Sequence, residues 1–191
     1  MSEIHDMSGV FKKYVPGKVF IETGTCYGRT VKFVLACGAI EVRSVEAGEV
    51  WYTACKDMFT NDRRVKLWHG LSDIMLPEMM KDITEPAIIF LDAHPAGIAH
   101  LGPTFGHDKI GKQGGESFTQ QQILQRELLA IATHPIKSHT IILDDQQLQG
   151  EEDIQEKYKE ILLQINPKYR ISLTQKEGLT PPVGCLIAEL I

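Results

Sequence analysis

The sequence lacks the features that mark several specialised classes of protein. Its four cysteines form no Cys-x-x-Cys motif, and scattered cysteines of this kind are expected to be free thiols in a reducing compartment. No apolar run reaches membrane-spanning length, and residues 1–9 are too polar for a secretory signal. The net charge of −5 argues against a general affinity for nucleic acid, although it leaves room for a local basic patch. We therefore expect a cytoplasmic protein that binds neither nucleic acid nor membrane.

What is present fits one globular domain spanning residues 1–191. Apolar residues make up 43% of the chain and charged residues 24%, an ordinary balance for a protein with a full core. Short apolar runs alternate with helical patterns, and two further strands follow the last helix. This alternation predicts an α/β open sheet with right-handed crossovers, in which ligands bind at the carboxyl ends of the strands.

The expected elements follow from apolar periodicity and from the positions of glycine and proline. Residues 1–18 are interpreted as a lead-in. Strands are expected at 18–22, 41–46, 65–68, 87–91, 139–143, 169–174 and 184–190. Helices are expected at 29–36, 50–59, 72–80, 119–132 and 151–165. Residues 95–118 carry six glycines and no periodicity, which is typical of a functional loop or of disorder.

The stretch Val19 to Gly28 joins the first expected strand to the first expected helix. It reads Val-Phe-Ile-Glu-Thr-Gly-Thr-Cys-Tyr-Gly, with Cys26 in place of the middle glycine of a dinucleotide fingerprint. Gly24 can take unusual backbone angles, and the missing side chains of Gly24 and Gly28 let a ligand approach. An acid at the strand end without a phosphate-binding turn indicates a ligand with hydroxyls and a cationic amino-acid tail. S-adenosylmethionine is the obvious candidate, and the alternative is that the glycines serve only the turn.

Further candidate residues follow the second and third strands. Glu46 ends the second strand about 20 residues after the glycine turn, where a carboxylate can accept hydrogen bonds from both ribose hydroxyls. The alternative is that Glu46 only ends a strand at the surface. Ser72, after the third strand, is placed either to flank an adenine or to cap a helix.

Three aspartates, Asp92, Asp144 and Asp145, follow the fourth and fifth strands. Clustered carboxylates repel one another unless a cation lies among them, and Mg²⁺ prefers such oxygen ligands. A metal there would bind an acceptor hydroxyl and lower its pKa. Acids that cap helices or bind water are an equally open alternative. His94, two residues after Asp92, is a candidate general base or a structural hydrogen-bond partner.

Four blocks of sequence carry a family resemblance: Phe-Ile-Glu-Thr-Gly-Thr, Ser-Val-Glu, Phe-Leu-Asp-Ala-His and Ile-Leu-Asp-Asp. Over about Val19 to Gln146, and in its expected terminal hairpin, the chain resembles the class I S-adenosylmethionine-dependent methyltransferases. It is most similar to the macrocin O-methyltransferase-like group. The resemblance implies a Rossmann-like open sheet of seven strands in the order 3-2-1-4-5-7-6, with the last strand antiparallel and helices on both faces.

The resemblance also implies which residues hold the ligands. The residues implied for S-adenosylmethionine are Glu22, Thr23, Gly24, Thr25, Tyr27, Gly28, Glu46, Ala47, Ser72 and Asp92. Those implied for Mg²⁺ are Asp92, Asp144 and Asp145, and those implied for catalysis are His94 and Asp92. The expected reaction moves the methyl group of S-adenosylmethionine to a hydroxyl of a small molecule or sugar.

Other functions stay open beside the methyltransferase reading. One is a protein of the same fold that binds S-adenosylmethionine without catalysis. Another is a nicotinamide-dependent oxidoreductase, against which the missing Gly-x-Gly-x-x-Gly counts. The segment Pro95-Ala96-Gly97 departs from the tyrosine and paired glycines of similar proteins, so the sequence does not name the acceptor. It also does not decide between a monomer and a homodimer.

Overall fold

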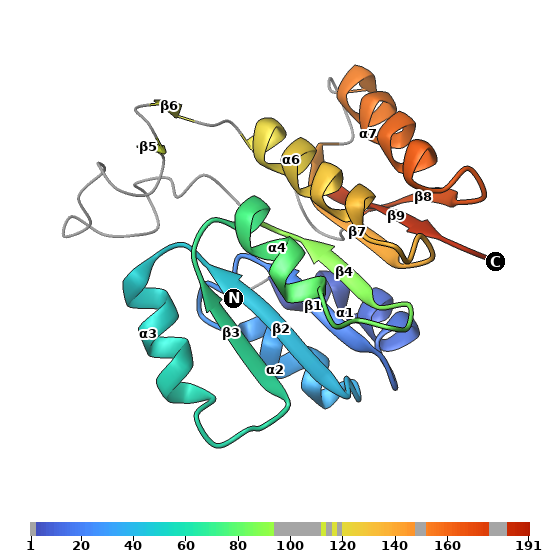
Figure 1. The fold of residues 1–191 in the computed structure, drawn as a ribbon. Helices are drawn as coiled ribbons and strands as arrows, with labels where there is room; N and C mark the ends of the chain where they lie inside the picture. The colour runs from blue at the N-terminus through green and yellow to red at the C-terminus, as the bar shows by residue number, and fades with distance from the viewer. Residues whose placement is uncertain (1–2, 94–111, 114–115, 118–119, 148–151, 176–182) are drawn as a thin grey trace.

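The computed structural model describes residues 3–93, 112–113, 116–117, 120–147, 152–175 and 183–191, and Figure 1 shows how they are arranged. A seven-stranded sheet forms the centre. Its strands are β1 (Val19–Thr23), β2 (Glu41–Glu46), β3 (Val65–His69), β4 (Ile88–Leu91), β7 (Thr140–Gln147), β8 (Arg170–Gln175) and β9 (Val183–Glu189). Their spatial order is β3-β2-β1-β4-β7-β9-β8, and β9 runs antiparallel to both neighbours. The predicted order and the antiparallel last strand are therefore confirmed.

Helices cover both faces of the sheet (Figure 1). They are α1 (Glu3–Tyr14), α2 (Arg29–Ala36), α3 (Glu49–Met58), α4 (Ser72–Met80), α6 (Gln120–Thr133) and α7 (Glu152–Ile165). Side chains of α4, α6 and α7 share one core cluster with Ile21, Ile89 and Ile141 of the sheet. Side chains of α1, α2 and α3 share the other cluster with Phe20 and Phe90. Successive residues of a strand point to opposite faces, so each central strand contributes side chains to both core clusters.

Helix α1 differs from the lead-in expected for residues 1–18. Met7, Val10, Phe11 and Tyr14 have the i, i+3, i+4, i+7 spacing of a helical stripe, which the polar character of the first residues obscured. Phe11 is 1% exposed and packs edge-on against Phe20. Burying a side chain of this size contributes roughly 1.5–3 kcal/mol. The buried Met7 and Val15 add to the attachment of this segment to the sheet.

Two other elements differ from expectation. Residues 112–113 and 116–117 form a short antiparallel ladder, β5 (Lys112–Gln113) with β6 (Glu116–Ser117), inside the segment expected to be a loop. Strand β7 runs on through Gln147, whereas the sequence predicted that it ends before Asp144. The pairing of β7 with β9 shifts between Leu143 and Gln146, and Asp145 has a φ of 50°. The two aspartates therefore lie in a bulge within a strand.

Helix α2 shows how local sequence determines these elements. It begins after Gly28 and ends where Gly38, with a φ of 93°, donates its N–H to the carbonyl of Leu35. Val31 and Val34 are its buried stripe. Within the described ranges, no helix is both long enough and apolar enough to cross a membrane.

Candidate active site at the carboxyl ends of the strands

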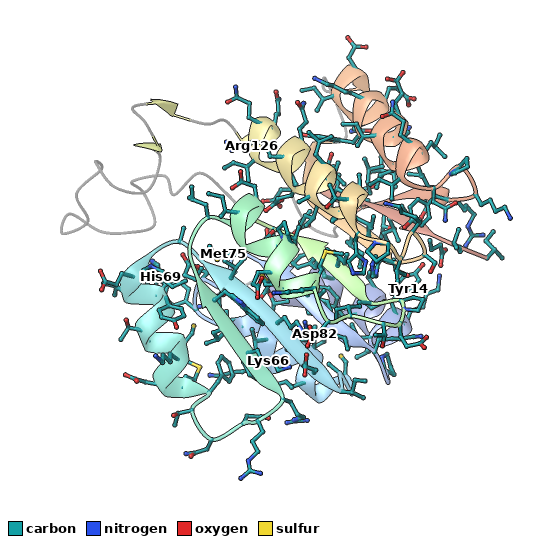
Figure 2. All side chains as sticks on the ribbon, viewed as in Figure 1. Tyr14, Lys66, His69, Met75, Asp82 and Arg126 are labelled. Carbon is teal, nitrogen blue, oxygen red and sulfur yellow. The ribbon has the colours of Figure 1, made fainter. Side chains whose placement is uncertain are left out.

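The parallel strands bring the predicted site residues to one edge of the sheet. Residues Val45, Thr23, Leu91 and Leu143 lie in register across β2, β1, β4 and β7. The next residues of these strands are Glu46, Gly24, Asp92 and Asp144. Figure 2 shows that His69 at the end of β3 and Met75 of α4 lie toward this edge, whereas Lys66 and Asp82 lie toward the opposite one.

The turn glycines are required by the protein itself. Gly24 has a φ of 87°, and a Cβ there would lie 2.7 Å from the carbonyl oxygen of Asp92. Gly28 has a φ of 66°, and a Cβ there would lie 2.8 Å from the ring of Phe59. The space beside both glycines is thus filled by protein atoms. The turn itself therefore requires glycine at both positions, and the expected approach of a ligand to this backbone stays a prediction.

Glu46 ties two turns together. Its Oε2 accepts a hydrogen bond of 2.8 Å from the backbone N–H of Cys26, and its Oε1 accepts one of 2.7 Å from that of Gly48. Cys26 belongs to the turn after β1, and Gly48 belongs to the turn between β2 and α3. Hydrogen bonds to a carboxylate are roughly twice as strong as those between neutral groups. Glu46 therefore does more than end a strand at the surface.

Glu22 lies beneath the same turn and is 1% exposed. The Ser44 hydroxyl donates to its Oε2 over 2.7 Å. Because that uses the single hydroxyl hydrogen of Ser44, the Thr25 hydroxyl must donate to Ser44, over 2.6 Å. Burial raises the pKa of Glu22 to about 8, the hydroxyls of Ser44 and Thr30 oppose this rise, and the charge of Glu46 adds to it. In the ligand-free site Glu22 therefore ionises less readily than an exposed glutamate.

Ser44 is a functional candidate that the sequence reasoning did not single out. It is fully buried in β2 and is the link between Glu22 and the turn residue Thr25. The signal was a hydroxyl inside a strand, directly before the apolar Val45 and two residues before the candidate Glu46. Thr23 has a comparable structural role, because its buried hydroxyl accepts the N–H of Asp92 over 3.1 Å and joins β1 to the end of β4.

Aromatic side chains surround the turn after β2. The Tyr27 and Trp51 rings meet edge-on with centroids 4.2 Å apart, and a Cβ on Gly48 would lie 3.1 Å from Trp51. His69 stacks on Tyr52 at 4.8 Å, and its Nε2 lies 3.3 Å from the carbonyl oxygen of Ala47. A carbonyl only accepts, so that nitrogen carries the hydrogen. His69 thus holds the carbonyl of Ala47, while Cys26 and Gly48 hold the neighbouring carboxylate of Glu46.

Helix α4 begins at the third strand end. Its N-cap is Leu71, with no side-chain capping bond, so the alternative capping role expected for Ser72 is wrong. Ser72 is buried at the first helical position. The following Asp73 pairs with Arg126 of α6 at 2.7 Å, and Figure 2 shows Arg126 on α6. This pair links two helices beside the site.

The three aspartates are not brought together as a metal site. Asp92 and Asp144 are at the same level of neighbouring strands, but Asp145 is the next residue in the β7 bulge. Among the residues that the structure describes, no group of three His, Cys, Asp or Glu side chains is placed to hold a metal ion. His94 lies outside the described residues, and its predicted catalytic role stays a prediction.

Known proteins resemble this chain in structure, not in sequence. No family model matches it, and no curated protein matches its sequence. A candidate methyltransferase of Streptococcus mutans in complex with S-adenosylhomocysteine (SAH) superimposes with a TM-score of 0.63 at 16% identity, covering 100% of this chain and 99% of that one. An O-methyltransferase of Bacillus cereus in complex with SAH gives 0.65 at 17%, covering 100% and 82%. The fold is that of the class I methyltransferases.

Other proteins share this methyltransferase fold with different stated substrates. A candidate rRNA methylase of Clostridium thermocellum has a TM-score of 0.59 at 16% identity and covers 100% of this chain and 98% of that one. Such a spread means that the fold alone does not choose the methyl acceptor. The narrower resemblance to the macrocin O-methyltransferase-like group stays a prediction.

Proposed function

We propose that the protein is an S-adenosylmethionine-dependent methyltransferase. The observation that carries the proposal is the pair of carboxylates, Glu22 and Glu46, at the ends of adjacent strands on either side of a glycine-bearing turn. S-adenosylmethionine has a cationic sulfur, a cationic amino group and two ribose hydroxyls. Carboxylates complement all of these, because an ionised carboxylate accepts hydrogen bonds and attracts cations.

Glu46 is proposed to accept hydrogen bonds from the ribose hydroxyls. Each of its oxygens accepts one backbone N–H, and an ionised carboxylate offers about four acceptor positions in total, so each oxygen retains capacity for a ligand. Ala47 and Ser72, at the second and third strand ends, are proposed to line the adenine position. Tyr27 and the turn residues 23–25 and 28 complete the proposed cofactor site.

Glu22 is proposed to balance the positive charge of the amino-acid tail in its ionised form, which a bound cation favours by lowering the pKa of the buried acid. Ser44 and Thr25 connect Glu22 to the turn through hydrogen bonds. When bound, S-adenosylmethionine supplies a methyl group on a positively charged sulfur. The task of the chain is to hold donor and acceptor in line and to exclude water, so positioning matters more than acid–base chemistry. Asp92, at the same edge, is proposed to orient the acceptor.

The proposed acceptor is a hydroxyl of a small molecule or sugar. The likeness to an O-methyltransferase supports it, and a net charge of −5 disfavours a polyanionic acceptor such as RNA. RNA is the alternative, which the likeness to an rRNA methylase raises. No step is derived through magnesium, since Asp92, Asp144 and Asp145 form no three-ligand group within the described ranges.

Calorimetric titration with S-adenosylmethionine and SAH, each with Mg²⁺ and with chelator, tests the proposal. We expect micromolar-range binding of both ligands, weakened at least tenfold by Glu46→Ala. Glu78→Ala is the matched control, because Glu78 is an exposed acid far along α4 and its loss should change nothing. Absence of binding under every condition would show that the turn has a structural role and does not bind S-adenosylmethionine. Formation of SAH with hydroxylated small molecules, but not with RNA, would then support the acceptor class.

A further inference from the structure

We propose that Glu46 is the positioning residue of the cofactor turn, holding it in its binding shape before any ligand arrives. This adds to the ribose contact and rests in part on the proposed function. The evidence is that three consecutive N–H groups of the turn all donate to the end of β2. Gly24 and Thr25 donate to the carbonyl of Val45 over 2.9 and 3.2 Å, and Cys26 donates to the Glu46 carboxylate over 2.8 Å.

A row of converging N–H groups after a strand is the arrangement that binds an anion in phosphate-binding turns. Here the anion for Cys26 is a side chain of the protein. The Glu46 carboxylate thus takes over a donor that a nucleotide phosphate would otherwise use. This gives a physical reason why the turn suits a nucleoside ligand without phosphates.

The backbone of Cys26 shows why the turn needs such a partner. Cys26 has a φ of 47°, in the left-handed region that residues with a Cβ disfavour. Positions of this kind persist only where surrounding contacts enforce them. One such contact is the Glu46 carboxylate, which accepts the Cys26 N–H and whose other oxygen accepts the N–H of Gly48. The Cys55 thiol also donates to the carbonyl of Cys26, over 3.2 Å, so the Glu46 variants test the share that the carboxylate contributes.

Hydrogen exchange in the ligand-free protein tests the positioning role without any cofactor. We expect Glu46→Ala to raise the amide exchange rate over residues 24–28 at least tenfold, with Glu46→Gln between wild type and Ala because an amide keeps one acceptor oxygen. Glu78→Ala is the control, with unchanged exchange in the turn. Unchanged exchange in Glu46→Ala, in a protein whose core strands stay protected, would overturn the proposal. This arm is independent of whether the protein is a methyltransferase.

A second variant links the positioning role to the strain at Cys26. Glycine adopts positive φ without the penalty of a Cβ, so Cys26→Gly should relax the need for Glu46. We expect Glu46→Ala to raise exchange in the turn severalfold less in the Cys26→Gly background than in wild type. Equal effects in the two backgrounds would contradict the role of strain, because independent sites add.

Binding of two ligands separates positioning from direct ribose contact. The probes are SAH and its 2′,3′-dideoxy analogue, which lacks both ribose hydroxyls. If Glu46 only read the hydroxyls, Glu46→Ala would weaken SAH and leave the affinity of the analogue unchanged. Positioning predicts that the analogue also loses at least fivefold in affinity. An unchanged analogue affinity would overturn the proposal, whereas failure of wild type to bind either ligand would count against the proposed function and leave the exchange result to decide the positioning role.

Discussion

The two edges of the sheet use buried polar groups in opposite ways. At the carboxyl-end edge the buried Glu22 and the partly buried Glu46 hold turn residues with only part of their hydrogen-bonding capacity. At the amino-end edge the buried groups are bases, and their hydrogen bonds are spent on one another and on the backbone. The difference indicates why the candidate ligand site lies at the carboxyl-end edge: only there do these groups keep acceptor positions that the fold does not use.

The amino-end edge is built around His139 and His134. The N–H of Ala87 donates to Nδ1 of His139 over 3.0 Å, so the hydrogen of His139 is on Nε2. That nitrogen lies 2.9 Å from Nδ1 of His134, which in turn places the hydrogen of His134 on Nε2, 3.0 Å from the carbonyl oxygen of Met80. This chain of donors assigns one tautomer to each ring.

Arg43 completes this edge. It is 5% exposed in β2 and donates to the carbonyl of Met79 and to Asp82. Two successive carbonyls at the end of α4, those of Met79 and Met80, are therefore capped by basic side chains, as the end of a helix dipole favours. The other end of α4, with Ser72, borders the candidate site. One helix thus joins the two edges.

The largest expected effect is at the carboxyl-end edge. The pKa of Glu22 is about 8 in the folded state, above its ordinary value of 4.5. Between these two pH values the folded state binds the proton and the unfolded state has lost it. The stability of the wild type therefore falls as pH rises from 4.5 to 8. Glu22→Gln carries no such penalty. We expect the variant to gain roughly 5 kcal/mol over wild type between pH 4 and pH 9, at about 1.36 kcal/mol per pKa unit. Urea unfolding across this range measures it, and a parallel pH dependence of the two proteins would contradict it.

The amino-end edge should respond to pH with the opposite sign. Burial lowers the pKa of His139 to about 4, and the nearby His134 and Lys137 add to the effect. The unfolded state binds a proton near pH 6.5 and the folded state does not, so stability is lost as pH falls from 6.5 toward 4. We expect this loss to be roughly 3 kcal/mol. Nitrogen-detected NMR should show His139 neutral at pH 5.5 with its hydrogen on Nε2; a charged ring at that pH would refute the donor chain.

The smallest effect concerns the pair that borders the site. Asp73 is mostly buried and Arg126 is 41% exposed, so solvent screens their attraction. A double-mutant cycle with Asp73→Asn and Arg126→Gln should give a coupling of about 0.5–1 kcal/mol in urea unfolding. The exposed pair of Glu156 and Lys159 is the control and should give less. Equal coupling free energies would mean that burial of Asp73 does not strengthen the pair.

Much of the fold was predictable because its elements have local signals. The helix at 29–36 and the strand at 41–46 match expectation to the residue. The helix after the third strand also ends as expected, at Met80, but Ser72 is its first residue and not its cap. The extension of β7 was not predictable in this way. It depends on pairing with β9, a strand distant in sequence, whereas Asp144-Asp145 alone looks like a strand end.

The candidate site was predictable in its residues and not in their partners. An acid after an apolar strand indicates where Glu22 and Glu46 lie, because the sheet edge follows from topology. That Glu46 binds the Cys26 N–H depends on the path of the turn, which no spacing rule specifies. The magnesium interpretation assumed that three strand-end acids converge, and the bulge in β7 changes that geometry.

Strand β9 has a consequence for how the chain is made. It lies between β7 and β8, both of which precede it in the sequence. As the ribosome releases the chain, β1 to β4 can pair in sequence, but β7 exposes a free row of N–H and C=O groups until residues 183–189 emerge. An open edge of this kind is a template for pairing with other chains. We therefore expect nascent chains that stop before residue 183 to misassemble more readily than chains that include β9.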